Sequence, residues 1–345
     1  MLRDRVAEPA ETAREGPGPG EGPPFLAIVG PTASGKTALS LALAERMEVE
    51  IISMDSRQIY RGMDVGTGKA TSEEREAVRH LGLDVRDPDE RYSAGQFSRD
   101  ARRWISEIRE RGRVPLLVGG TGFFLRALLK PMFSQPPMDR GRLLGLREYL
   151  NDLPFDTLMR YVAVLDPDRA ALAKGGGRQR STRTVEMALL TGRPLSWWHR
   201  ECEPAEEPLL GVVTVLELPR DLLYDRINRR VDRMVRDGLV EEVRGLLAAG
   251  FGPGDPGMTG AGYREIVRYL QGDLSLDDAV EEVRRSHRRY ARRQMTWNRH
   301  QLPEGTAFLD GTRPGSELVE EILEVWEANG DGRGQGRINR GEGRS

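Results

Sequence analysis

Residues Gly30–Thr37 read GPTASGKT and fit the pattern G-x-x-x-x-G-K-[ST] in full. An apolar run at Phe25–Val29 precedes the segment and helical spacing follows over Thr37–Met47, so the motif has the strand–loop–helix context of a phosphate-binding loop. Its glycines let the backbone curl so that N–H groups face an anion, and the start of the helix adds its positive end. The lysine supplies a mobile cation, and the threonine hydroxyl can ligate Mg²⁺. The segment predicts a bound di- or triphosphate, held by Gly30, Pro31, Thr32, Ala33, Ser34, Gly35, Lys36 and Thr37.

Short, continuous apolar runs recur along the chain and are typical of strands buried on both faces of a sheet. Helical spacing lies between them, as in Gly95–Arg111. This alternation predicts an α/β fold in which helices wrap a parallel sheet. Besides Phe25–Val29, the expected strands are Val49–Met54, Val114–Val118, Gly211–Leu218 and Thr306–Asp310.

Residues 134–200 interrupt the alternation because they contain helical patterns but no convincing strand. We interpret them as a helical insertion at one edge of the sheet, which divides the core into residues 25–133 and 201–312. Both ends of the chain are rich in glycine and charged residues and lack the apolar residues of a core, which predicts disordered tails at residues 1–24 and 328–345. The second tail contains arginine and glycine, which suits RNA contact, but a solvated tail is the favoured interpretation.

The composition limits the classes of function. The chain has 345 residues, of which 38% are hydrophobic and 31% charged, and a net charge of -2 does not by itself indicate a nucleic-acid binder. The single cysteine, Cys202, excludes an internal disulfide or a zinc cluster of thiolates, and four scattered histidines form no metal motif. No apolar run approaches the roughly 18 residues of a membrane span, and the first residues lack the apolar stretch of a signal peptide. We expect a soluble cytoplasmic protein.

A carboxylate follows the second expected strand. Asp55 comes directly after Val49–Met54, and the carboxyl ends of parallel strands lie on the rim that carries the phosphate loop. Asp55 can therefore orient or deprotonate a nucleophile. The alternative is a helix N-cap, for which aspartate is a favoured residue, and sequence position alone favours the cap.

The third expected strand ends without an acid. Kinases and nucleotidases with this loop place a Mg²⁺-holding carboxylate after a second buried strand. Here Val114–Val118 is followed by Gly119-Gly120-Thr121-Gly122, which weakens a nucleotidase interpretation. The glycine pair suits close approach of a ligand or a plain tight turn, and we give these two interpretations equal weight.

Arginines cluster at helical spacing in three places. One stripe has i, i+3, i+4, i+7 spacing beside an apolar stripe, and two rows of three follow near the C-terminus. Such concentration in a nearly neutral chain fits binding of a phosphate backbone. The alternative is ion pairing with the acidic segment Asp277–Glu282. The stripe is Arg226, Arg229, Arg230 and Arg233, the rows are Arg284, Arg288, Arg292 and Arg285, Arg289, Arg293, and the third cluster is Arg178, Arg180 and Arg183.

An ordered set of motifs, over about residues 25–310, resembles the tRNA dimethylallyltransferase family, also called tRNA isopentenyltransferases. GPTASGKT is followed by DSRQIYRGMDVGTGK, RVPLLVGGTGFFLRALL, QRSTRTVEMALLTGRPLS, RRVDRMVRDGLVEEVRGLL, AGYREIVRYLQGD and RRYARRQMTWNR. A phosphate loop alone is common, whereas this ordered set is specific. The absence of an appended zinc finger is typical of bacterial-type members.

The resemblance implies a P-loop kinase-like core with a helical insertion, and dimethylallyl diphosphate rather than ATP in the phosphate loop. It implies transfer of the dimethylallyl group to the exocyclic amine of the adenosine 3′-adjacent to the anticodon of tRNA. Asp55 matches the family residue that accepts the amine proton, and Thr37 matches the hydroxyl near the bridging oxygen of the diphosphate. Lys36 and Arg230 match the cations that take up charge on the leaving diphosphate, which also holds Mg²⁺ next to Thr37.

The resemblance further implies contacts with the tRNA anticodon stem-loop, no membrane partner, and a monomer. Arg142 stands nearest to an arginine that family members often carry early in the insertion. The chain departs from the family at residues 66–70, where GTGKA replaces the frequent GTAKP, and at Gly176-Gly177, where an Asn-Asp pair is usual. The implied tRNA contacts are Asp55, Ser56, Arg57, Gln58, Thr121, Arg142, Gln179, Arg180, Ser181, Thr182 and Arg183.

Two other classes of function compete with the prenyltransferase. One is a small-molecule kinase on the same fold, in which Asp55 deprotonates a substrate hydroxyl. The other is a non-catalytic RNA-binding module with a structural phosphate loop. The missing strand-end acid and the arginine stripes favour the prenyltransferase over the kinase. The complete GKT and Asp55 favour it over the binding module.

Overall fold

The computed structural model describes residues 23–133, 136–204 and 206–330. They form two compact units: unit 1 contains the residues up to Leu128 and from Leu210 onward, and unit 2 contains Leu129–Leu209. The expected insertion, residues 134–200, falls inside unit 2.

Most of the two expected tails lies outside the described residues. At the C-terminus the expected boundary at residue 328 is wrong, because helix α14 (Gly315–Gly330) continues through it. At the N-terminus Pro23 is already part of unit 1, since its carbonyl accepts a hydrogen bond from Arg109 Nη1 at 3.1 Å.

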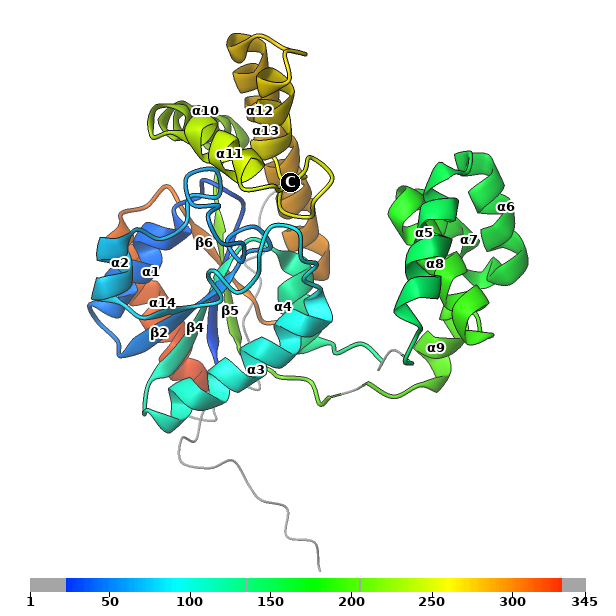
Figure 1. Cartoon of the computed structure of the whole chain (residues 1–345). Helices are drawn as coiled ribbons and strands as arrows, with labels where there is room; N and C mark the ends of the chain where they lie inside the picture. Colours follow the sequence, from blue (N-terminus) through cyan, green and yellow to red (C-terminus); the bar gives the residue numbers. More distant parts are fainter. Residues whose placement is uncertain (1–22, 134–135, 205, 331–345) are drawn as a thin grey trace, which may run out of the picture. The chain divides into compact units, whose positions relative to one another are not determined.

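Unit 1 is built on a six-stranded sheet in the order β3-β2-β4-β1-β5-β6 (Figure 1). Every pairing is parallel, which confirms the predicted α/β fold. All strands expected from apolar runs are present. The strand β3 (His80–Leu81) was not predicted, because a strand of two residues has no periodic pattern. The others are β1 (Leu26–Val29), β2 (Val49–Met54), β4 (Val114–Gly119), β5 (Val212–Glu217) and β6 (Ala307–Asp310).

The register of the sheet places the ends of β1, β2 and β4 level with one another, and β5 continues past them to Glu217. Val29 of β1 pairs with Gly119 of β4 and with Val215 of β5, and Gly119 also pairs with Met54 of β2. The loops that leave these strands at their carboxyl ends therefore start from one rim, where open α/β sheets keep their sites. The phosphate loop and Asp55 both start there.

Helices cover both faces of the sheet (Figure 1). On one face, Leu43 of α1 (Lys36–Ala44) and Ile322 of α14 join the strands in one core. On the other face, α3 (Ala94–Glu110) packs on β2 and β4. The short helices α2 (Ser72–Ala77) and α4 (Gly122–Leu129) complete this part of the chain.

Four helices lie between β5 and β6 in the chain. The apolar stripe of the first is buried, as its spacing predicts, and Leu223 and Ile227 in that stripe pack against Ala291 of the last. This packing places the arginine-rich helices side by side. The four helices are α10 (Arg220–Arg236), α11 (Leu239–Ala248), α12 (Tyr263–Leu270) and α13 (Leu276–Gln301).

Unit 2 is helical over its described residues, apart from one isolated bridge between Phe133 and Pro204. Its own core joins Leu150, Val162 and Val185 from three helices. Those helices are α5 (Arg140–Asp152), α6 (Phe155–Leu165) and α8 (Gly177–Thr191), with α7 (Ala170–Gly175) and α9 (Leu195–Glu201) beside them in sequence. Within the described ranges, every helix is too short or too polar to serve as a transmembrane span.

Candidate functional site

The phosphate loop leaves β1 and enters α1, as its motif predicts. Gly35 is the N-cap of α1 and has a φ of 106°, which favours glycine. The Lys36 side chain folds back on the loop, where Nζ donates to Pro31 O at 2.7 Å. A phosphate oxygen would offer this ammonium a stronger, charge-assisted partner than the carbonyl.

The lowered pKa of the Lys36 ammonium is typical of a cation in an anion-binding site without its anion. Burial and, to a smaller extent, the Arg230 cation lower the pKa of the Lys36 ammonium to about 7, against the opposing effect of the Asp55 carboxylate. Burial also lowers the pKa of Arg230, again against the effect of Asp55. Two half-buried cations therefore repel each other with one carboxylate nearby, and a bound anion relieves their repulsion.

Two arginines of α10 contact the loops at the rim. Arg226 Nη1 donates to Ser34 O at 3.1 Å, and Arg230 Nη2 donates to Thr67 O at 2.8 Å. Both line a cavity of about 660 Å³. Cations and loop N–H groups around one cavity suit a diphosphate. The lining also includes Gly35, Lys36, Thr37, Arg229, Arg233 and Arg236.

The glycine-containing turn at residues 64–69 contacts Arg230. The Glu242 carboxylate of α11 accepts hydrogen bonds from three successive N–H groups, those of Asp64–Gly66, at 2.8, 2.7 and 3.0 Å. Gly68 has a φ of 58°, and a Cβ there would lie 2.4 Å from Arg230 Nη2. The turn is thus held rigidly by α11 and leaves room for the guanidinium.

Asp55 leaves β2 at the same rim, and the chain continues into turns, so the helix-cap interpretation is wrong. Its Oδ1 accepts a hydrogen bond from the Arg57 N–H at 2.8 Å and closes a turn instead. Both neighbours of Asp55 are tied to Thr121. The Thr121 N–H donates to Met54 O at 3.3 Å, and the Thr121 hydroxyl accepts from the Ser56 N–H at 3.0 Å. The carboxylate is therefore fixed on both sides.

A smaller cavity, of about 70 Å³, brings the predicted catalytic residues together. Asp55, Lys36, Thr37 and Arg230 all line it, although they come from three separate segments of the chain. This grouping provides a base, a hydroxyl and two cations around one small space at the end of the phosphate loop. The lining also includes Thr32, Gln58, Gly120 and Gln294.

The residues that follow Asp55 are held within unit 1. Arg57 Nη1 donates to Pro256 O at 2.6 Å, and Gln58 Nε2 donates to Gly68 O at 3.1 Å. With Ser56 they are half-buried at the rim. Their predicted contact with tRNA stays a prediction.

Two residues of α13 belong to this site although sequence reasoning did not single them out. Gln294 lines the smaller cavity, and Tyr290 lies beside the Thr121 hydroxyl. Burial and the Asp55 charge raise the pKa of the Tyr290 phenol to about 12, so it stays protonated at neutral pH. Both lie in the motif RRYARRQMTWNR, which was the available signal.

The glycines after β4 are required by the chain itself. A Cβ at Gly119 would lie 2.1 Å from Met54 O, and one at Gly120 would lie 2.1 Å from Gln294 Nε2. A Cβ at Gly122 would lie 2.3 Å from the Trp297 ring. The approaching atoms belong to β2 and α13, so neither close approach of a ligand nor a plain tight turn is needed to explain these glycines.

The residues of unit 2 that were predicted to contact tRNA differ in how exposed their side chains are. Ser181 and Thr182 are buried, and the Ser181 hydroxyl donates to a backbone carbonyl of α7 at 3.2 Å. Their burial speaks against direct contact of these two side chains with RNA. Arg183 is half-buried and pairs with Glu186 at 3.5 Å. The residues with exposed side chains are Arg142, Gln179 and Arg180.

The arginine rows of α13 have different surroundings. Arg284 pairs with Asp232 and with Glu281, the latter at 3.2 Å, and Arg288 pairs with Glu281 at 2.8 Å. Arg285 also pairs with Glu281, at 3.4 Å, so the ion-pair alternative is correct for these three residues. The exposed members of the rows are Arg285, Arg289, Arg292 and Arg293.

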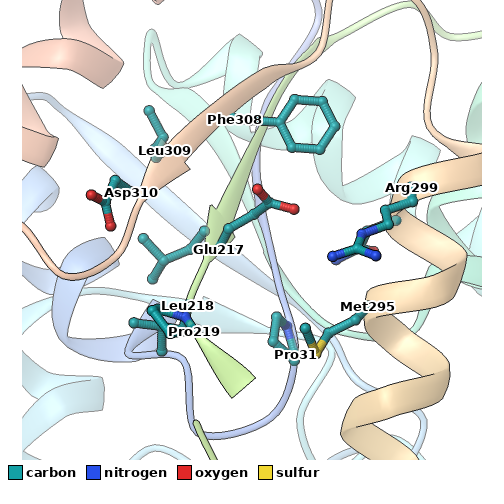
Figure 2. A pocket seen from close by; sticks show the side chains of 11 residues that line it. Pro31, Glu217, Leu218, Pro219, Met295, Arg299, Phe308, Leu309 and Asp310 are labelled. Atoms are coloured by element: carbon teal, nitrogen blue, oxygen red, sulfur yellow. The ribbon is translucent and has the colours of Figure 1, made fainter. Parts of the chain in front are cut away.

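A further cavity, of about 350 Å³, lies beside Pro31 at the carboxyl ends of β5 and β6 (Figure 2). The side chains of Glu217 and Arg299 point toward each other across it, and the Phe308 ring lies at its edge. The predicted catalytic residues line the two cavities described above, so this third cavity is separate from the reacting groups.

Comparison with known proteins adds a family. The family described as IPP transferase matches residues 58–301. A tRNA dimethylallyltransferase of Geobacter metallireducens is 43% identical over 275 residues, which cover 80% of this chain and 89% of that protein. One of Thermomicrobium roseum is 42% identical over 316 residues, which cover 89% and 94%.

Solved structures give the same result. The full-length tRNA isopentenylpyrophosphate transferase of Bacillus halodurans is 36% identical, with a TM-score of 0.65 and coverage of 90% of this chain and 97% of that one. A eukaryotic dimethylallyltransferase that acts on tRNA is 26% identical, with a TM-score of 0.71 and coverage of 90% and 77%.

Proposed function

Because this chain belongs to the IPP transferase family and is a prenyltransferase that acts on tRNA, we propose that the rim of the sheet in unit 1 is its active site. The donor is dimethylallyl diphosphate, and the acceptor is the exocyclic amine of the adenosine 3′-adjacent to the anticodon. The observation that carries the assignment of residues is the single small cavity lined by Asp55, Lys36, Thr37 and Arg230.

The Asp55 carboxylate and the Lys36 and Arg230 cations have different roles in the proposed reaction. The amine nitrogen bonds to the first carbon of the dimethylallyl group while the bond from that carbon to the diphosphate oxygen breaks. Asp55 accepts the proton that the amine loses. Lys36, Arg230 and the loop N–H groups take up the charge on the departing diphosphate. Thr37, in the first turn of α1, donates its hydroxyl hydrogen to the bridging oxygen in this proposal.

The residues present fit a Mg²⁺ ion held mainly by the diphosphate. Thr37 lines both cavities, and Mg²⁺ at phosphate sites takes only one or two protein ligands beside substrate oxygens and water. Among the described residues, no group of three or more His, Cys, Asp or Glu side chains could hold a metal without the substrate. We propose Thr37 as the protein ligand. The ion supplies positive charge to the leaving group when it is bound.

The second partner is the tRNA anticodon stem-loop. The target base must leave its stack, at a cost of a few kcal/mol, which contacts with the rest of the RNA offset. The exposed arginines of α13 and the exposed residues of unit 2 supply candidates for those contacts: Arg285, Arg289, Arg292, Arg293, Arg142, Gln179 and Arg180. We propose a monomer that works in the cytoplasm without a membrane partner.

A transfer assay tests this proposal. The full chain, Mg²⁺ and dimethylallyl diphosphate labelled in the dimethylallyl group are incubated with unmodified tRNA. We expect label in the RNA, located by nuclease mapping at the adenosine next to the anticodon, and no label when that adenosine is replaced by guanosine. ATP in place of the donor should give no ADP. Turnover of ATP to ADP without transfer of label would move the assignment to a small-molecule kinase.

A further inference from the structure

Gln294 joins three segments of the active site. It lies on α13 with a side chain only 7% exposed. Its Oε1 accepts a hydrogen bond from the Thr32 N–H of the phosphate loop at 2.8 Å, and its Nε2 donates to Gly120 O after β4 at 2.9 Å. One carboxamide thus satisfies one donor and one acceptor on two different loops, which an apolar side chain of the same size cannot do.

The bond to Gly120 also bears on the proposed base. Thr121 follows Gly120 directly and holds the backbone on both sides of Asp55, through the 3.3 Å bond to Met54 O and the 3.0 Å bond from the Ser56 N–H. A shift of Gly120 therefore shifts the anchor of the carboxylate. Through Thr32, the same amide sets the position of the loop that carries the diphosphate.

The Gln294 side chain packs closely against the loop after β4. A Cβ at Gly120 would lie 2.1 Å from Nε2, so the loop after β4 is shaped around the amide. The side chain lines the cavity that Asp55 and Lys36 share, although it is not placed in the reacting positions. We propose that Gln294 is a positioning residue for prenyl transfer. It fixes the position of the phosphate loop relative to Thr121, which holds the backbone on both sides of Asp55. This inference rests on the function proposed above.

The first test is Gln294→Met in the full chain, which keeps the volume and removes both hydrogen bonds. Small misplacement of reacting groups costs up to about 100-fold in rate, so we expect the single-turnover rate at saturating substrates to fall about 10- to 100-fold. The KM for dimethylallyl diphosphate should change by less than about threefold, because the cations that bind the donor are intact. The control is Gln301→Met, the same change at the exposed end of the same helix.

The second test is Gln294→Glu, which separates positioning from packing. An ionised glutamate accepts from Thr32 but cannot donate to Gly120, whereas a protonated glutamate can do both. The rate of this variant relative to the parent should therefore rise as the pH falls. The other groups that line the cavity are the same in both proteins, so the ratio isolates the introduced carboxyl.

The outcomes are separable. Parent-like rates for folded Gln294→Met, a lower melting temperature with an unchanged rate per active site, or a raised KM with an unchanged rate would each overturn the positioning role. If Gln294→Met does not fold, a flat pH ratio for Gln294→Glu would overturn it. A parent enzyme that transfers no label to tRNA contradicts the proposed function instead, and that result is read before any variant is compared.

Discussion

Asp55 is held by its neighbours on both sides, so its removal can be tested without collapse of the rim. Asp55→Asn keeps an oxygen that can accept the Arg57 N–H and removes the proton acceptor. We expect the single-turnover rate of transfer to fall by about 10²–10⁴, the usual range for a positioned base. The affinity for tRNA should change much less. Near-normal single-turnover rates would reduce Asp55 to the residue that closes a turn.

Lys36 gives donor binding a pH dependence. Burial lowers the pKa of its ammonium to about 7 in the free protein, and a bound diphosphate raises that pKa. Binding therefore takes up a proton above pH 7, and affinity is highest below that pH and falls as pH rises, by at most about tenfold per pH unit. Calorimetry of donor binding in buffers of different ionisation enthalpy measures this proton uptake.

The control for this prediction is Lys36→Met. The proton uptake that is due to the Lys36 amine should be absent in this variant, whereas any proton uptake by the diphosphate itself should remain. Equal proton uptake by the parent and the variant would assign the whole effect to the donor.

The sequence predicts the residues of the site that lie in one motif and misses those that act from afar. Lys36 and Thr37 follow from the phosphate loop alone, because a local backbone pattern places them. Gln294 and Glu242 act on loops far away in the chain, and the motifs that contain them do not show which loop each side chain binds. Their partners are set by the packing of α13 and α11.

At the scale of elements, α13 carries two kinds of arginine. Arg289 and Arg292 are exposed, whereas Arg284 and Arg288 are half-buried and paired with Glu281. Replacement of Arg289 and Arg292 by Gln should flatten the log–log dependence of tRNA affinity on salt by about one to two units, at about 0.7–0.9 per phosphate contact. The loss should be similar for every tRNA, because phosphate contacts do not read sequence.

The matched control replaces Arg284 and Arg288 by Gln on the same helix. This pair should lower the melting temperature and leave the salt slope nearly unchanged, since it breaks ion pairs inside unit 1. If the exposed pair leaves the slope unchanged as well, α13 does not contact the RNA backbone. Donor affinity should stay constant in both double variants.

Elements with a strong period were predictable, and short or context-dependent ones were not. The apolar strands of the sheet are recognisable in the sequence as continuous apolar runs, because both of their faces are buried. The strand β3 is held by pairing with β2 alone, and its sequence gives no sign of this. The segment after Asp55 has residues suited to a helix start, but the Thr121 bonds and the Arg57 turn hold it in another conformation.

At the scale of the whole molecule, the proposed donor site lies in unit 1, and unit 2 has a core of its own. Dimethylallyl diphosphate at about 100 times its Kd should stabilise the unit that binds it by about 2.7 kcal/mol. We expect hydrogen exchange to slow in unit 1 with donor and Mg²⁺, and in residues 129–209 only when tRNA is added. Donor-induced protection of unit 2 without tRNA would contradict this expectation.

Gly68 leaves the space that the Arg230 guanidinium occupies. A Cβ at residue 68 would lie 2.4 Å from Arg230 Nη2, so any side chain there would push the guanidinium away from Thr67 O. The absence of a side chain in this turn therefore decides where one of the two cations near the phosphate loop can lie. A change at residue 68 would alter the site without touching any residue that lines its two cavities with a charge.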